Sequence, residues 1–126
     1  YGIGSSSLIA KLNKIRQPFN VNAMAQSAAL AALDDDEYIE FCREKIVDGV
    51  QYLANQFNKL GLETVPSAAN FLLVKIMNGK KVFEDLQKRK IVVRPMNVYN
   101  LPDYVRVSVG KEDQNKKIIN AFSEIF

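Results

Sequence analysis

The stretch of sequence that decides the fold covers residues 104–109 and reads Tyr-Val-Arg-Val-Ser-Val. Valine occupies every second position of this stretch, and successive side chains of an extended strand point to opposite faces of a sheet. The alternation therefore predicts a strand with one apolar face. Arg106 lies in the middle of the other face, and Gly110 ends the strand.

The segments around this strand predict helices and further strands. Apolar residues spaced three and four apart predict helices, and short apolar runs bounded by turn residues predict strands. The expected helices cover residues 5–17, 23–33, 36–60, 80–90 and 113–126, and the expected strands cover residues 62–65, 68–77, 91–93 and 104–109. Asn78 and Gly79 are a turn signal, and residues 97–103 are expected to form a loop. This order predicts an α+β fold, in which helices cover a small mixed or antiparallel sheet of about four strands.

The longest expected helix begins at an acidic cluster and carries an apolar stripe. Residues 34–37 read Asp-Asp-Asp-Glu, and negative charge at a helix N-terminus complements the helix dipole. A metal site is the alternative interpretation of these four acids. Gly61 provides the C-terminal stop. Cys42 lies on the stripe and is expected in the core rather than as a nucleophile. The stripe consists of Ile39, Cys42, Ile46, Val50, Leu53, Phe57 and Leu60.

The composition excludes several classes of function. The chain has 126 residues, of which 48% are hydrophobic and 25% charged, values typical of one globular domain. It has no histidine and one cysteine, which excludes a Ser-His-Asp triad, a histidine metal site, a zinc ribbon and an internal disulfide within this chain. No segment has the pattern of a signal peptide or a membrane span. The net charge of +3 permits anionic partners without requiring nucleic acid.

Two arginines are candidate ligand-binding residues. Arg106 lies in mid-strand, and its planar guanidinium group suits a carboxylate in a bidentate arrangement. Arg94 precedes Pro95, which restricts the backbone of Arg94 and so directs its side chain. Both side chains could point toward one anion. Exposure to solvent, or a structural ion pair, is the alternative for each.

Three other segments each have two interpretations. The turn over residues 16–22 contains Phe19 and Asn20 and fits the rim of a ligand site; alternatively, its asparagines cap a helix and Phe19 is a hydrophobic staple. The high alanine content of the helix over residues 23–33 is explained by helix propensity alone, or by close packing of this helix against a second domain or subunit. The basic stretch over residues 79–94 fits a solvated helix face better than an RNA-binding surface, and it lacks the pattern of a P-loop.

Three ordered motifs together span essentially the whole chain. Residues 1–3 read Tyr-Gly-Ile, and residues 13–22 read Asn-Lys-Ile-Arg-Gln-Pro-Phe-Asn-Val-Asn. Residues 66–74 read Pro-Ser-Ala-Ala-Asn-Phe-Leu-Leu-Val, and residues 91–96 with 101–110 form the third motif. The first motif resembles the segment after the cofactor lysine of histidinol-phosphate aminotransferases, which are fold type I PLP-dependent enzymes. The second resembles a strand of their C-terminal domain, and the third resembles their closing motif.

The resemblance implies an enzyme that moves an amino group between L-histidinol phosphate and 2-oxoglutarate in histidine biosynthesis, with pyridoxal 5′-phosphate (PLP) as cofactor. It also implies a cytoplasmic homodimer, with neither nucleic acid nor a membrane as partner. Residues 1–126 are expected to form a single domain. By this resemblance, residues 36–126 are the small C-terminal domain of such an enzyme, and residues 1–35 are leading helices that bridge to a PLP-binding domain.

The resemblance also assigns roles to four residues. Arg106 matches the arginine that binds the α-carboxylate of the substrate, and Arg94 matches the arginine near the substrate phosphate. Phe19 and Asn20 match the turn that borders the substrate site. The Schiff-base lysine and the other cofactor-binding residues of the family precede the segment that matches Tyr1, so no catalytic, cofactor-binding or metal-binding residue is expected here. We therefore expect this chain to be part of a longer protein and to be inactive alone.

Two alternative functions stay open at this point. A threonine-phosphate decarboxylase-like enzyme shares the architecture and also handles a phosphorylated amino acid. A free-standing α+β module that binds small anions or RNA belongs to another class, and it would bind its ligand as an isolated domain.

Overall fold

The structure is a computed structural model that describes residues 2–126, so the expectations for Tyr1, in a loop and in the first motif, lie outside the described residues. The chain divides into two compact units between Ile39 and Glu40. The first unit contains two helices and the beginning of a third, and the second contains the sheet and the remaining helices.

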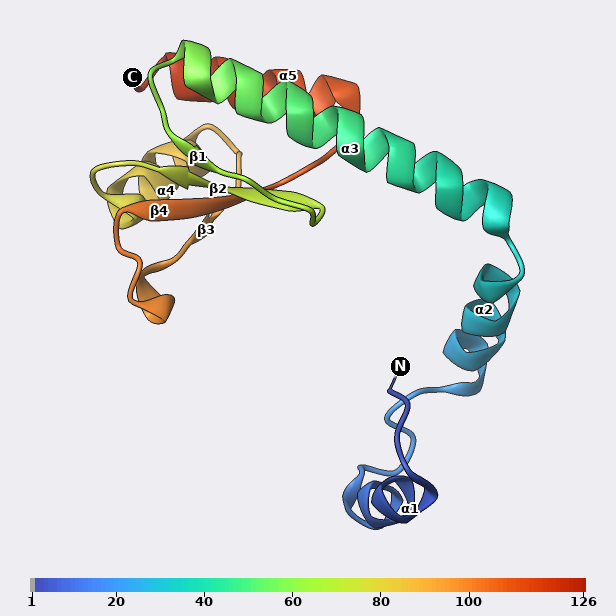
Figure 1. The fold of residues 1–126 in the computed structure, drawn as a ribbon. Helices are drawn as coiled ribbons and strands as arrows, with labels where there is room; N and C mark the ends of the chain where they lie inside the picture. The colour runs from blue at the N-terminus through green and yellow to red at the C-terminus, as the bar shows by residue number, and fades with distance from the viewer. Residues whose placement is uncertain (1) are drawn as a thin grey trace. The chain divides into compact units, whose positions relative to one another are not determined.

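The first unit contains helices α1 (Ser6–Ile15) and α2 (Ala23–Leu33), both visible in Figure 1. Each helix begins at a side chain of a type that commonly caps helix N-termini. The backbone N–H of Leu8 donates to Ser5 Oγ at 3.4 Å, and that of Ala25 donates to Asn22 Oδ1 at 2.8 Å. The cap interpretation of Asn22 is therefore confirmed. Within the described residues, neither helix buries a side chain.

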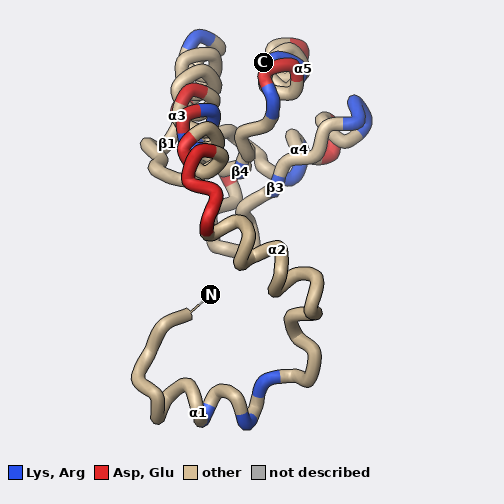
Figure 2. Tube along the Cα trace, turned by 90° about the vertical axis from the view of Figure 1, so that its right-hand side faces the viewer, with Lys and Arg blue, Asp and Glu red and all other residues tan. Residues whose placement is uncertain are grey.

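The acidic cluster marks the start of helix α3 (Asp36–Lys59). Figure 2 shows these acidic residues together at the beginning of the helix. The backbone N–H of Tyr38 donates to Asp35 Oδ1 at 3.1 Å, which satisfies one of the donors that the first helical turn leaves unpaired. The cluster thus acts as a helix cap, as its position at a helix N-terminus predicts.

The second unit is built around a four-stranded sheet. Its strands are β1 (Thr64–Val65), β2 (Phe71–Lys75), β3 (Arg94–Pro95) and β4 (Tyr104–Ser108). Their order across the sheet is β1-β2-β4-β3, and every neighbouring pair is antiparallel. The predicted α+β fold with a small antiparallel sheet is confirmed.

One face of this sheet carries the hydrophobic core. Helices α3, α4 (Gly79–Lys88) and α5 (Glu112–Ser123) all contribute to it, and α3 and α5 lie side by side in Figure 1. The rings of Phe57 and Phe122 join these two helices edge to face, with 4.9 Å between centroids. Val105 and Val107 of β4 are fully buried in this core, which confirms the alternation of residues 104–109. The other core residues on the strands and helices are Leu53, Leu72, Val74, Val82, Leu86, Ile119 and Ala121.

The apolar stripe of α3 is buried over only part of its length. The buried residues of this helix are Gly49, Leu53 and Phe57, all in its C-terminal half. Cys42 is only half-buried and lies outside the core cluster, so its predicted place in the core is wrong. The reason is that the sheet, α4 and α5 pack against the C-terminal half of α3. The predicted stop is confirmed, because Gly61 has a left-handed φ of 75° directly after the helix.

The expected strand over residues 91–93 is wrong. Lys90 has a left-handed φ of 61°, and the N–H of Ile91 donates to the carbonyl oxygen of Leu86 at 3.0 Å, so this residue closes the C-terminus of α4. Val93 is buried in the core, and only Arg94 and Pro95 pair with β4. The expected loop over residues 97–103 begins with a short 3₁₀-helix, η1 (Asn97–Tyr99).

The expected turn at Asn78 and Gly79 is instead the beginning of α4. Asn78 is the N-cap of this helix, because its Oδ1 accepts the N–H of Lys81 at 3.0 Å, and Gly79 is the first helical residue. The expected strands over residues 62–65 and 68–77 are shorter in the structure, where only Thr64–Val65 and Phe71–Lys75 pair.

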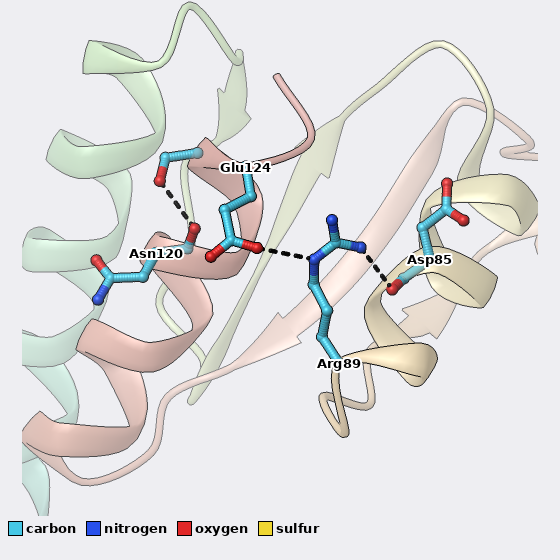
Figure 3. A network of polar contacts seen from close by, with 5 residues as sticks. Asp85, Arg89, Asn120 and Glu124 are labelled. Atoms are coloured by element: carbon cyan, nitrogen blue, oxygen red, sulfur yellow. Dashed lines mark hydrogen bonds and ion pairs between the residues drawn. The ribbon is translucent and has the colours of Figure 1, made fainter.

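Two basic residues at the C-terminal end of α4, Lys88 and Arg89, are engaged with acidic partners at the surface. Arg89 Nε donates to Glu124 Oε2 at 3.1 Å and its Nη1 donates to the carbonyl oxygen of Asp85 at 3.0 Å, so this arginine joins α4 to the end of α5 (Figure 3). Lys88 donates to the carboxylate of Asp85 at 3.1 Å, and this hydrogen bond holds the pKa of Asp85 below its usual value. These contacts favour the interpretation of the basic stretch as a solvated helix face.

None of the helices in residues 2–126 is long and apolar enough to cross a membrane.

Candidate functional site

The two candidate arginines are direct neighbours across the sheet. Strands β3 and β4 pair antiparallel with Arg94 opposite Arg106. Directly opposed residues of an antiparallel pair place their side chains on the same face, with Cβ atoms about 4.5–5.5 Å apart. Because Val105 and Val107 occupy the core face of β4, both arginines lie on the face away from the core. We call this second face, which carries Arg94, Arg106, Leu73 and Phe71, the arginine face.

Arg106 is half-buried in the middle of the arginine face. Its Nε atom is buried and has no hydrogen-bond partner in residues 2–126. Its Cζ atom lies 5.0 Å from the centroid of the Phe71 ring, in a cation–π arrangement. No acid of the described residues forms an ion pair with it. The structural ion pair considered for Arg106 is therefore wrong, and its guanidinium group retains donors for a ligand.

Arg94 is exposed at the edge of the same face. Its Nη2 donates to the hydroxyl oxygen of Tyr99 at 3.2 Å, and its Cζ lies 5.6 Å from the centroid of the Tyr99 ring. Like Arg106, it forms no ion pair with an acid within the described part of the chain. The predicted exposure of Arg94 is confirmed. An exposed guanidinium held by a tyrosine keeps most of its N–H donors available.

Tyr99 was not among the residues that the sequence indicated. It ends η1, a turn in which its N–H donates to the carbonyl oxygen of Met96 at 2.9 Å. Asn100 follows with a left-handed φ of 58°, a conformation that asparagine tolerates better than most residues. The N–H of Leu101 then donates to the carbonyl oxygen of Met96 at 3.3 Å, and this hydrogen bond closes the loop. No local pattern in the sequence indicates the contact of Tyr99 with Arg94, because it forms around the η1 loop.

Phe19 and Asn20 belong to the other unit of the chain, which ends at Ile39. Asn20 Oδ1 accepts a hydrogen bond from Arg16 Nη1 at 2.9 Å. Phe19 has a left-handed φ of 58° and is 92% exposed. The interpretation of Phe19 as a hydrophobic staple is therefore wrong. The role of this turn as the rim of a ligand site stays a prediction.

The arginine face has the chemistry of an anion site. A guanidinium group binds carboxylate or phosphate through parallel N–H···O bonds, and the two groups here come from adjacent strands in fixed register. The geometry therefore fits the binding of an anionic group.

Comparisons with known proteins agree with this fold. Residues 1–122 match the family described as aminotransferase class I and II. The histidinol-phosphate aminotransferase of Akkermansia muciniphila is 39% identical over 125 residues, which cover 99% of this chain and 34% of that protein. Histidinol-phosphate aminotransferase 1 of Thiobacillus denitrificans is 42% identical, over 99% of this chain and 33% of that protein.

Solved structures show the same architecture. The histidinol-phosphate aminotransferase of Clostridium acetobutylicum matches with a TM-score of 0.82 and 28% identity, over 94% of this chain and 37% of that one. The enzyme of Sinorhizobium meliloti, solved with pyridoxal 5′-phosphate, matches with a TM-score of 0.82 and 25% identity, over 94% of this chain and 34% of that one. The chain spans about a third of the length of the curated relatives that it matches. With a family match over residues 1–122, the chain belongs to the class I and II aminotransferases.

Proposed function

We propose that this chain is the C-terminal, substrate-binding part of a PLP-dependent aminotransferase that moves an amino group between L-histidinol phosphate and 2-oxoglutarate. The observation that carries the proposal is the pairing of Arg94 with Arg106, two cationic groups on one face, neither of which forms an ion pair with an acid in residues 2–126. The family match over residues 1–122 and relatives named histidinol-phosphate aminotransferase support it.

The two substrates explain why two separate cations are useful. Histidinol phosphate carries a phosphate but no carboxylate, whereas glutamate and 2-oxoglutarate carry two carboxylates each. We assign the α-carboxylate of glutamate to Arg106, and the phosphate or the distal carboxylate to Arg94. A substrate held at both ends reacts with a lower entropic barrier, because its reacting carbon is already in place. Phe19 and Asn20 are assigned to the turn that borders the substrate site, as the resemblance implies.

The proposal includes the cofactor and the assembly. PLP, when bound, supplies the electron sink for the transfer, and the lysine that holds it belongs in this proposal to another segment of a longer protein. Residues 36–126 act as the small domain, and residues 1–35 act as leading helices that bridge to a PLP-binding domain. A homodimer in the cytoplasm, without nucleic acid or a membrane as partner, belongs to the same proposal.

The test uses the full-length protein that contains this chain, supplied with PLP. We expect glutamate to form from histidinol phosphate and 2-oxoglutarate. Release of carbon dioxide from threonine phosphate, without formation of glutamate, would favour the decarboxylase-like alternative instead. Residues 1–126 alone, mixed with PLP, are expected to show no absorbance band of lysine-bound PLP that disappears when substrate is added. Turnover by this chain alone would contradict the assignment of the cofactor lysine to another segment.

A substitution in the same full-length protein tests the role of Arg106. Lysine keeps the positive charge but loses the bidentate arrangement, so we expect Arg106→Lys to raise KM for glutamate by about 10- to 100-fold. Arg43→Lys is the matched control, because Arg43 pairs with Glu40 on the exposed side of α3. An equal effect of both variants on KM would contradict the role of Arg106.

A further inference from the structure

Two guanidinium groups at directly opposed strand positions repel each other, so something must hold them apart. Like charges directly opposed across a sheet are destabilising, and an acid between them is the usual remedy. In residues 2–126 neither Arg94 nor Arg106 has such an ion pair. Each arginine instead lies against an aromatic ring, that of Tyr99 for Arg94 and that of Phe71 for Arg106.

The two rings lie in different directions from the arginine pair. Strand β4 lies between β2 and β3 in the sheet. Phe71 belongs to β2, where it pairs with Ser108, so Arg106 extends from β4 toward β2. Tyr99 follows the edge strand β3 along the chain, so Arg94 reaches toward the η1 turn. The aromatic contacts therefore draw the two guanidinium groups apart.

The contacts differ in chemistry as well as in direction. Phe71 offers only a ring face, whereas Tyr99 adds a hydroxyl oxygen that accepts a hydrogen bond from Arg94 Nη2 at 3.2 Å. A cation–π contact restrains the position of a guanidinium group loosely, and a hydrogen bond to a second point fixes its orientation. Arg94, the more exposed of the two, has both restraints.

We propose that Phe71 and Tyr99 are positioning residues that set the spacing of the two guanidinium groups, and with it the fit of a phosphate or distal carboxylate at Arg94 and of an α-carboxylate at Arg106. Tyr99 acts through Arg94 on the anion remote from the reacting carbon, and Phe71 acts through Arg106 on the α-carboxylate. This inference rests on the proposed function, because it uses the substrates assigned there.

The experiment measures the two half-reactions separately in the full-length, PLP-loaded protein. Histidinol phosphate, which has no carboxylate, reports on the Arg94 end, and glutamate reports on both ends. We expect Tyr99→Phe, which removes only the hydroxyl, to weaken apparent binding of histidinol phosphate by about 5- to 20-fold, with little change in the rate at saturation. Phe71→Leu is expected to weaken binding of glutamate by a similar factor and to leave histidinol phosphate unaffected.

Two comparisons separate positioning from a general structural effect. Tyr52→Phe, on α3 in the same unit, is the matched control and is expected to change neither half-reaction. In an Arg94→Met background, Tyr99→Phe is expected to have no further effect, because the residue through which it acts is gone. The inference would be overturned if Tyr99→Phe still weakened binding of histidinol phosphate in the Arg94→Met background. It would also be overturned if Tyr99→Phe and Phe71→Leu weakened binding of histidinol phosphate and of glutamate equally.

The wild-type protein distinguishes the two levels of the proposal. If it does not react with histidinol phosphate, the proposed function fails, and the assignment of Tyr99 to the phosphate end fails with it. If it reacts and Tyr99→Phe binds histidinol phosphate as well as the wild type does, only the positioning role is overturned.

Discussion

The Nε atom of Arg106 is a buried donor for which residues 2–126 supply no acceptor. A buried polar group without a partner costs about 1–3 kcal/mol, and the contact with the Phe71 ring recovers about 0.5–1 kcal/mol. The side chain therefore lowers the stability of the fold while it keeps a donor ready for a ligand. Removal of the guanidinium group should act in opposite directions on folding and on binding.

We predict that Arg106→Met raises the free energy of unfolding of the 126-residue chain by about 1 kcal/mol, because it replaces the unpaired donor with an apolar chain of similar length. Arg43→Met is the control, since the side chain of Arg43 is 64% exposed and its guanidinium group pairs with Glu40 at the surface. The control is expected to change stability by less than about 0.5 kcal/mol. Denaturant titration measures both, and a loss of stability in Arg106→Met would contradict the prediction.

Gly79 gives a second prediction for a single residue. A Cβ atom at this position would lie 2.8 Å from the carbonyl oxygen of Tyr104 and 2.9 Å from that of Pro102, which are both backbone atoms. We expect Gly79→Ala to lower the free energy of unfolding by about 1–3 kcal/mol, because the backbone must shift to make room. Gly2→Ala, which would meet nothing within 4 Å, is the matched control. Equal midpoints of thermal unfolding for the two variants would contradict this reason.

Elements with strong local signals were predicted well from the sequence, and elements that depend on distant pairing were not. The serine, asparagine and aspartate caps and the stop at Gly61 act within one helical turn, so their signals are local. The apolar run over residues 91–93 looks like a strand on its own. It forms none, because Ile91 bonds back to α4 and only Arg94 and Pro95 reach β4.

The candidate site was predicted in part for the same reason. The types and neighbours of Arg94 and Arg106 indicate an anion site, but their common face depends on the register of β3 against β4. That register is a tertiary feature which no local pattern specifies. Phe71 and Tyr99 were missed as partners because their contacts to the arginines cross between strands or around a loop.

The partial burial of α3 predicts a difference between its two halves. Leu53 is fully buried, whereas Ile39 is 49% exposed on the same apolar stripe. We expect Leu53→Ala to lower the free energy of unfolding of the 126-residue chain by about 2–5 kcal/mol. Ile39→Ala is expected to change it by less than about 0.5 kcal/mol. Chemical denaturation followed by circular dichroism makes the comparison, and similar losses in both variants would show that the stripe is buried evenly.

For the molecule as a whole, exposed apolar surface is concentrated in the first unit. Exposed apolar patches of this kind are typical of surfaces that bind another protein or domain. We therefore predict that the 126-residue chain alone self-associates as its concentration rises. Sedimentation velocity over a wide range of concentration measures this, and a monomer throughout would contradict the prediction. The exposed large apolar residues of the unit include Ile3, Ile15, Phe19, Met24, Leu30 and Leu33.

The shortness of β3 has a consequence for how this molecule avoids faulty assembly. Only Arg94 and Pro95 pair with β4, and a slip of one residue along a strand moves every side chain to the opposite face. A chain slipped by one residue would turn the Arg94 guanidinium group toward the hydrophobic core and leave Pro95 facing water. The buried guanidinium group of such a chain carries a large desolvation penalty, and the two arginines no longer share one face, so misassembled copies are both unstable and unable to hold an anion.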